Sequence, residues 1–240
     1  NNMLFNSNLK LAMFDLDGTL IDTLPQISRA LDLAMIDAGY RAPGLDDARL
    51  WVGNGSKKLV ERAVLAARDN DSGKHPAQGD AAVIAMIEQV QSRFFEHYDH
   101  CCEVACPLYA GVRELLDYCQ RTDVTLACVT NKPARFSQRV LDAAGIGSYF
   151  ALVISGDSLA ERKPHPAPLQ HVMSHFEVDA RHAVMVGDSR NDILAARAAG
   201  VTIIAVDYGY NYGESIPNPE TGCDDAPDLL VSNLASCCRA

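Results

Sequence analysis

Long apolar runs are missing from this chain of 240 residues. No stretch approaches the roughly 20 apolar residues that a membrane-spanning helix needs, and the first residues lack the basic, apolar and small-residue pattern of a secretory signal. Runs of Lys and Arg are missing too, because 21 basic residues stand against 31 acidic ones and give a formal net charge of −10. We therefore expect neither a membrane nor a nucleic acid as a partner.

Zinc-type cysteine spacing is also missing. The chain has eight cysteines but no pair of Cys-x-x-Cys motifs. Cys119 falls in a helical pattern and Cys128 in a strand pattern, which is typical of buried thiols rather than of a disulfide framework. Without a secretory signal pattern, reduced thiols predict a cytoplasmic protein.

What the chain does contain is an alternation of strand and helix patterns from about residue 105 onward. Expected strands cover residues 9–14, 124–129, 151–155, 183–186 and 201–206, and expected helices cover 134–144, 169–176 and 193–199. The strands are almost continuously apolar, as in a parallel sheet that is covered on both faces. We predict an α/β fold with a Rossmann-like parallel sheet and helices on both faces.

Residues 23–103 break this alternation. Apolar residues at helical spacing cover 27–38, 59–67 and 83–94. The polar stretch 69–76 lacks a glycine and a glutamate at the positions that a calcium loop requires, so we predict a plain loop. The expected domains are an α/β core of residues 1–22 and 104–240, and an all-helical domain of residues 23–103 inserted after the first strand.

Two aspartates follow the first strand, in Asp15-Leu16-Asp17-Gly18-Thr19. Residues two apart in an extended segment face the same side, so both carboxylates are aimed into one small volume. They repel each other unless a metal ion neutralises them or they divide acid and base roles. Gly18 permits the sharp turn that follows. The alternative is a plain Asp-Gly turn at a strand end, and partners elsewhere in the chain decide between the two.

Other expected strands also end in polar groups, namely Thr130-Asn131, Gly156-Asp157 and Gly187-Asp188. Ligands of open parallel sheets bind outside the carboxyl ends of the strands, so we expect these groups to converge on one crevice. Thr130 or Asn131 also suits a cap for the helix after Pro133, and Asp192 suits the first turn of its own helix. Lys163 stands in Lys163-Pro164-His165-Pro166, where two prolines exclude a regular helix.

These groups, in this order, resemble the four motifs of the haloacid dehalogenase-like superfamily. The segment 15–19 is similar to its first motif, Thr130-Asn131 to its second, Lys163 to its third, and the segment 187–192 to its acidic fourth motif. The resemblance covers essentially the whole chain, since the helical insertion is similar to the mobile cap of that superfamily.

The resemblance implies a Mg²⁺-dependent phosphatase that acts through an aspartyl-phosphate. Asp15 would be the nucleophile and a metal ligand, while Asp17 would act as general acid and base and bind the metal through its backbone carbonyl. Asp188 would be the remaining protein ligand of the metal, and Asp192 would orient waters or Lys163 nearby. The phosphoryl oxygens would be held by Thr130, Asn131 and Lys163.

Two relatives within the superfamily differ from this pattern at single positions. Its dehalogenases lack an acid at the position of Asp17 and need no metal, so Asp17 favours metal-dependent phosphoryl transfer. A phosphonate-cleaving relative forms a Schiff base with a cap lysine, and Lys57 and Lys58 stand in the expected cap. That relative typically lacks the acid corresponding to Asp17, so we expect both lysines to be solvated.

Three stretches resemble bacterial phosphoglycolate phosphatases, which hydrolyse 2-phosphoglycolate to glycolate and phosphate: residues 51–55 with 59–63, residues 163–166 and residues 208–214. The Gly53-Asn54-Gly55 turn is a candidate site for the substrate carboxylate, through its backbone N–H groups. An interhelical turn that needs positive φ explains these glycines about equally well. The stretch 208–212 is either a loop beside the crevice or plain surface.

The expected function is therefore hydrolysis of a small phosphate monoester, with 2-phosphoglycolate first among the candidates, by a monomer or small homo-oligomer. A sugar-phosphate phosphatase or a phosphomutase is the alternative within the superfamily, because cap residues choose the substrate. A non-catalytic module that binds a phosphorylated metabolite is the alternative from another class. Every motif position carries a competent residue, which argues against that last alternative.

Overall fold

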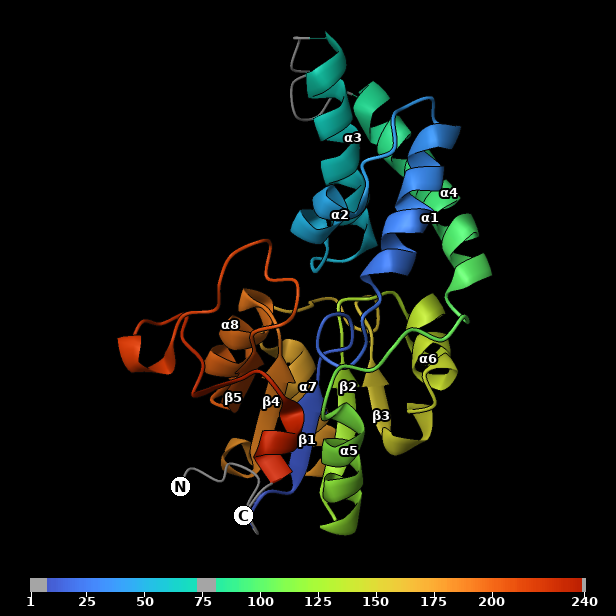
Figure 1. The fold of residues 1–240 in the computed structure, drawn as a ribbon. Helices are drawn as coiled ribbons and strands as arrows, with labels where there is room; N and C mark the ends of the chain where they lie inside the picture. Colours follow the sequence, from blue (N-terminus) through green and yellow to red (C-terminus); the bar gives the residue numbers. More distant parts are fainter. Residues whose placement is uncertain (1–7, 73–80, 239–240) are drawn as a thin grey trace.

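Six parallel strands form the centre of the protein (Figure 1), in the order β3-β2-β1-β4-β5-β6. The computed structural model describes residues 8–72 and 81–238. The strands are β1 (Leu11–Phe14), β2 (Thr125–Val129), β3 (Leu152–Ile154), β4 (Ala183–Gly187), β5 (Thr202–Val206) and β6 (Leu229–Val231). The predicted parallel sheet is confirmed, and each of its five predicted strands is present within two residues of the expected bounds.

The central position of β1 explains its unbroken apolar sequence. Phe14 pairs with Cys128 of β2 on one side and with Val186 of β4 on the other, and every residue of β1 is buried. Only apolar side chains suit a strand that is covered on both faces. β6 lies at the sheet edge beside β5 and is only half buried, so its three residues gave no comparable signal.

Helices cover both faces of the sheet, as predicted. Helices α5 (Val112–Arg121) and α6 (Ala134–Ala143) pack on one face, and α7 (Ala167–Phe176) and α8 (Arg190–Ala199) pack on the other. Short 3-10 helices lie at Gly147–Tyr149, Ala180–His182, Pro219–Thr221 and Leu234–Cys238. This arrangement leaves the carboxyl ends of β1, β2 and β4 together at one edge of the sheet.

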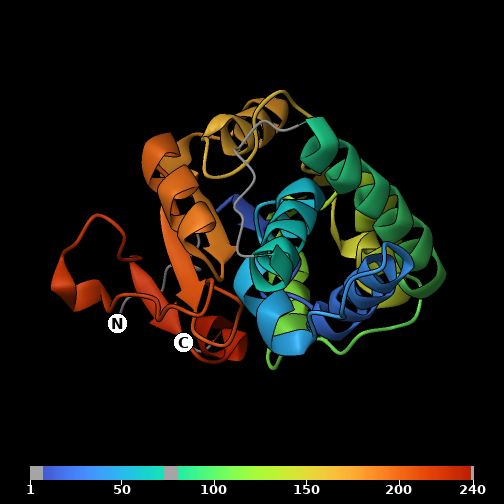
Figure 2. The same cartoon turned by 90° about the horizontal axis from the view of Figure 1, so that it is seen from above.

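A group of four helices lies beyond that edge, as Figures 1 and 2 show. It consists of α1 (Leu24–Asp37), α2 (Leu45–Trp51), α3 (Ser56–Ser72) and α4 (Ala81–Cys101), with α1 packed along α4. Helix α2 was not predicted, because only Ala48 within it is buried and it carries no apolar stripe. The loop predicted over 69–76 is wrong at its beginning, since α3 continues to Ser72, and residues 73–76 lie outside the described ranges.

The four helices are docked on the core through charged and polar contacts. Asp99 of α4 accepts hydrogen bonds from Arg135 and Arg139 of α6, the latter at 2.7 Å between Nη1 and Oδ1. Arg49 Nη2 of α2 donates to the Gly209 carbonyl at 3.2 Å. Within residues 8–72 and 81–238, no helix is long and apolar enough to cross a membrane.

Candidate active site

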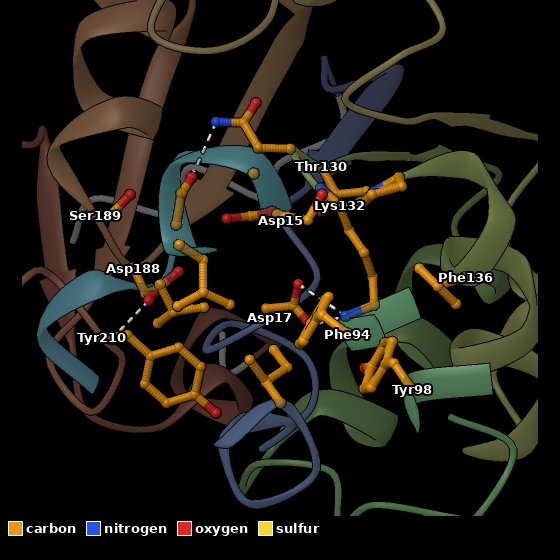
Figure 3. Close-up of a pocket in the computed structure, with 18 residues that line it drawn as sticks. Asp15, Asp17, Phe94, Tyr98, Thr130, Lys132, Phe136, Asp188, Ser189 and Tyr210 are labelled. Carbon is orange, nitrogen blue, oxygen red and sulfur yellow. Dashed lines mark hydrogen bonds and ion pairs between the residues drawn. The ribbon is translucent and has the colours of Figure 1, made fainter. Parts of the chain in front are cut away.

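The carboxyl ends of three strands bring the predicted site residues into one place (Figure 3). Asp15 follows β1, Thr130 follows β2 and Asp188 follows β4. Lys163 reaches the same place from the loop between β3 and α7, since its Nζ lies 3.1 Å from Asp15 Oδ1. The convergence that the sequence predicted at this edge of the sheet is therefore observed for these four residues.

Three carboxylates are clustered at the centre of the site. Asp15, Asp188 and Asp192 each present an oxygen, and these oxygens lie within 4.8 Å of one another. Asp188 is held in place by Thr19 Oγ1, which donates to Oδ1 at 2.8 Å, and by the Tyr210 N–H, which donates to Oδ2 at 2.7 Å. The carboxylate of Asp188 is therefore held in place by two hydrogen bonds, one to each of its oxygens.

The electrostatics of this cluster favour a cation. Burial raises the pKa of Asp15 to about 7, although Lys163 lowers it, and the carboxylates of Asp192 and Asp17 raise it further. Burial, together with Asp15 and Asp192, raises the pKa of Asp188 well above its usual range. Close like charges in a dry site cannot all stay ionised without a counter-charge. A positive ion among these oxygens would relieve both shifts.

The donor set of the cluster fits a hard divalent ion such as Mg²⁺. Its atoms are carboxylate oxygens, which Mg²⁺ and similar cations prefer, and it contains no thiolate or imidazole. The side chain of Asp17 lies outside the cluster, and its carboxylate pairs with Lys132.

Lys163 is a buried cation of the site. Its Nζ lies 2.7 Å from Asp192 Oδ1 as well as 3.1 Å from Asp15 Oδ1, and only 2% of the residue is exposed. Burial alone would lower the pKa of this lysine, but the carboxylates of Asp15 and Asp192 outweigh it and hold the pKa above the usual range. Lys163 is therefore charged and placed against the predicted nucleophile.

The carboxylate of Asp192 has two structural roles, at the first turn of its own helix and beside Lys163. Its Oδ2 accepts from the backbone N–H of Asp188 and Ser189 and from Ser189 Oγ, which forms a capping box at the start of α8. Its Oδ1 accepts from Lys163. Both oxygens are thus engaged, one with the helix N-terminus and one with the lysine, so Asp192 orients Lys163 in this structure.

Neither Thr130 nor Asn131 caps helix α6. The first free N–H of that helix, on Ala134, donates to Asp157 Oδ1 at 2.8 Å. Thr130 Oγ1 accepts from the Lys132 N–H at 3.1 Å, which leaves its own proton available to an anion. The Asn131 amide donates to the carbonyls of Gly53 at 3.0 Å and Lys163 at 2.8 Å. Asn131 would accordingly reach a phosphate through its backbone rather than its side chain.

Two residues around Asp17 were missed by the sequence analysis. Lys132 Nζ lies 2.9 Å and 3.2 Å from the two carboxylate oxygens of Asp17, and Thr23 Oγ1 donates to Oδ1 at 2.6 Å. Burial would lower the pKa of Lys132, but the Asp17 carboxylate outweighs it and keeps the pKa above the usual range. A lysine before a proline is common in solvated loops, so the sequence offered little reason to place Lys132 in the site. Its position directly after Thr130-Asn131 was the one indication.

The Gly53-Asn54-Gly55 turn is docked directly onto the core. The Gly53 carbonyl accepts from Asn131 Nδ2 at 3.0 Å and from Asn191 Nδ2 at 3.2 Å. Gly53 and Gly55 have φ of 126° and 86°, which a residue with a side chain rarely adopts. A Cβ at Gly53 would also lie 2.7 Å from Tyr212 Oη. The turn therefore needs glycine for its backbone and for its close approach to the core.

The stretch 208–212 is a loop beside the crevice, which settles an alternative that the sequence left open. Tyr210 lines the cavity and binds Asp188 through its N–H, and Tyr208 Oη donates to the Thr19 carbonyl at 2.7 Å.

Lys57 and Lys58 are exposed on the cap, and Lys58 pairs with Glu61 at 2.7 Å. The expectation that these two lysines are solvated is thus confirmed.

A cavity of ≈ 50 Å³ lies between the strand ends and the helical cap. The acidic and phosphate-type groups form its floor, and Gly53, Gly55, Phe94 and Tyr98 of the cap form its roof. The hydrogen bonds from Asn131 and Asn191 to the Gly53 carbonyl hold the cap against the core beside this cavity.

The comparison with protein families matches the description "Haloacid dehalogenase-like hydrolase" over residues 12–206. The chain belongs to this family. The match extends from β1 to β5 and so includes the strand ends and the inserted helices described above. Haloacid dehalogenase-like hydrolases are enzymes, and the resemblance stated from the four motifs is confirmed.

Several proteins similar to this chain share the name phosphoglycolate phosphatase. Phosphoglycolate phosphatase 1 of Pseudomonas aeruginosa is 39% identical over 225 residues, which cover 94% of this chain and 77% of that protein. Phosphoglycolate phosphatase of Colwellia psychrerythraea is 39% identical over 227 residues, which cover 92% and 95%. The crystal structure of a predicted phosphoglycolate phosphatase from Haemophilus somnus is 32% identical with a TM-score of 0.84, and the match covers 95% of this chain and 96% of that one.

The raised pKa of Asp15 predicts how the stability of the metal-free protein depends on pH. An unfolded aspartate has a pKa of about 4 and folded Asp15 one of about 7, so its contribution to stability is present below about pH 4 and is lost as the pH rises through about 7. We expect the Tm of EDTA-treated protein to fall between about pH 5 and about pH 8 by more than that of Asp15→Asn. Calorimetry measures both, and parallel Tm profiles would contradict the expectation.

Proposed function

We propose that this protein is a Mg²⁺-dependent phosphatase that hydrolyses 2-phosphoglycolate to glycolate and phosphate. The observation that carries the proposal is the position of Asp15, whose carboxylate lies beside the Lys163 ammonium and within a cluster of oxygen ligands. A phosphate dianion repels a carboxylate. Nucleophilic attack by Asp15 therefore requires positive charge beside it, from the Lys163 ammonium and from a cation held by the oxygen cluster.

In the first step, an Asp15 carboxylate oxygen attacks phosphorus and the bond from phosphorus to the ester oxygen breaks. Asp17 gives a proton to that leaving oxygen, and glycolate departs from an aspartyl-phosphate on Asp15. In the second step, Asp17 takes a proton from water as the water oxygen attacks phosphorus. Inorganic phosphate leaves, and Asp15 is again a carboxylate. Thr130 Oγ1 and Lys163 Nζ hold the phosphoryl oxygens throughout.

Mg²⁺ would be held by the carboxylates of Asp15 and Asp188 and by the backbone carbonyl of Asp17, with Asp192 beside it. When bound, it neutralises negative charge on the phosphoryl group and on the nucleophile. The remaining contributions come from the chain itself. The hydrogen bonds of Asp188 with Thr19 and Tyr210 fix a ligand, and the contact of Asp192 with Lys163 fixes the cation.

The choice of substrate is supported by the names of the similar proteins. We propose that residues 23–103 form a cap that opens on the core of residues 1–22 and 104–240. Closure over a small ester then excludes water from the aspartyl-phosphate. The Gly53-Asn54-Gly55 turn, which closure brings onto Asn131 and Asn191, would contact the non-phosphorylated end of the substrate.

A panel of phosphate monoesters compared by kcat/KM in the presence of Mg²⁺ tests the proposal. We expect 2-phosphoglycolate to lead the panel, which would also contain hexose phosphates and a chromogenic aryl phosphate. A sugar phosphate that is better by orders of magnitude would replace the substrate and leave the phosphatase class intact. No turnover of any ester would favour the binding module instead.

A further inference from the structure

Lys132 is a buried cation that the hydrolysis steps above do not use. Only 6% of the residue is exposed, and its side chain lines the cavity between the core and the cap. In Figure 3 its side chain extends toward Asp17, with Tyr98 of the cap beside its end. Lys132 Nζ lies 4.7 Å from the centre of the Tyr98 ring, so the ammonium stands at the junction of the core and the cap.

The ammonium of Lys132 has hydrogen-bonding capacity to spare. It carries three N–H donors, and its two short contacts, at 2.9 Å and 3.2 Å, both go to the single carboxylate of Asp17. Two other polar atoms on the cavity wall, Tyr98 Oη and Asn131 Oδ1, are buried without a hydrogen-bond partner of normal geometry within residues 8–72 and 81–238. The Tyr98 hydroxyl does interact with Lys132, and both polar atoms are placed to take part in binding a polar ligand.

We propose that Lys132 is a specificity residue that binds the carboxylate of the leaving group. The proposal rests on the proposed function and deepens it, because it names the group that distinguishes a carboxylated phosphate ester from a neutral one. The ammonium forms a charge-assisted hydrogen bond to the carboxylate, and Tyr98 Oη donates a second one from the cap.

The position of Lys132 relative to Asp17 fits this role. In 2-phosphoglycolate one carbon separates the ester oxygen from the carboxylate carbon, so the carboxylate oxygens lie roughly 3–4 Å from the ester oxygen. A general acid lies within hydrogen-bond reach of the ester oxygen that it protonates. Lys132 Nζ is hydrogen-bonded to Asp17, so it lies within reach of the carboxylate of this short leaving group.

The cavity wall near Lys132 is apolar, so the choice between a carboxylated and a neutral substrate depends on this lysine. The surfaces near it are apolar and come from Ile27, Val52, Leu59, Phe94 and Phe136. A carboxylate moved from water to such surroundings is strongly disfavoured unless a cation meets it. Among the described residues that line the cavity, Lys132 is the only lysine or arginine; Lys163 does not line it and lies between Asp15 and Asp192.

The test compares 2-phosphoglycolate with its neutral amide, 2-phosphoglycolamide, as substrates of the Mg²⁺-loaded enzyme. We expect the wild type to prefer the carboxylate in kcat/KM, and Lys132→Met to lose that preference by about 30-fold or more. Lys132→Arg, which keeps the charge, should retain most of it. Lys57→Met removes an exposed cap lysine, makes the same change in net charge and should leave the preference unchanged.

Each other outcome has a distinct meaning. An equal loss of kcat/KM for both esters in Lys132→Met would overturn the proposal, because Lys132 would then act only by positioning Asp17. An unchanged preference would overturn it as well. A wild type that hydrolyses other esters but not 2-phosphoglycolate would contradict the proposed function itself. If Lys132→Met fails to fold in thermal unfolding, Lys132→Gln, which retains a neutral donor, replaces it in the same comparison.

Discussion

Asp15→Asn is expected to lower kcat for 2-phosphoglycolate by about 10⁴-fold or more, as the loss of a nucleophile does in other enzymes that form covalent intermediates. The amide is nearly the same size as the carboxylate and fits the same space beside Leu16 N and Lys163 Nζ. It cannot form an aspartyl-phosphate, however, and it contributes no negative charge to the oxygen cluster. Phosphate release in single-turnover and steady-state assays measures the loss.

Asp157→Asn is the matched control for this variant. Asp157 also follows a strand, but it is exposed, and among the described residues its carboxylate accepts a hydrogen bond only from the N–H of Ala134 at the start of α6. Its replacement by asparagine should leave kcat within about threefold of the wild type, since asparagine is itself a good cap. Turnover by Asp15→Asn at the level of Asp157→Asn would show that Asp15 is not the nucleophile.

Lys163→Met is expected to have the largest effect on stability. In the wild type the Lys163 ammonium lies between the carboxylates of Asp15 and Asp192, and both Lys163 and Asp192 are buried. Removal of one partner of a buried ion pair leaves uncompensated charge and costs about 3–5 kcal/mol of unfolding free energy. Turnover should also fall steeply, because no other ammonium of the described residues is within salt-bridge distance of Asp15.

Urea unfolding in EDTA measures this loss, and Lys10→Met is its control. Lys10 is exposed just before β1, so its replacement changes the net charge equally without exposing a buried carboxylate. Addition of Mg²⁺ should restore part of the stability of Lys163→Met, because a cation bound to the cluster neutralises the same carboxylates. Equal unfolding free energies for the two variants would refute the structural role given to Lys163.

The sheet was predictable because its inner strands are buried on both faces. Burial on both sides requires an uninterrupted apolar run, and such a run appears in the sequence without knowledge of any partner. The polar residues that end these runs, Asp15, Thr130 and Asp188, were predictable for a related reason. A polar group at the end of a buried strand is costly unless it meets a partner, so each of them pointed to the same crevice.

Features that depend on contacts between distant segments were not predictable. The role of Lys132 depends on Asp17, 115 residues earlier, and on Tyr98 of the cap. The docking of Gly53 depends on Asn131 and Asn191, and neither amide differs in sequence from a surface residue. Helix α2 is short and largely exposed, and strand β6 is short and only half buried, so the tertiary contacts that stabilise them leave no periodic pattern.

The most direct test of the central claim is phosphate release from 2-phosphoglycolate by the wild type, measured after EDTA treatment and then during titration with Mg²⁺. The oxygen cluster of Asp15, Asp188 and Asp192 and the raised pKa of Asp15 predict no activity without the metal and a saturable return of full activity with it. Activity that persists unchanged in EDTA would contradict the account, because Asp15 would then attack a phosphate dianion without the cation that the site is built to hold.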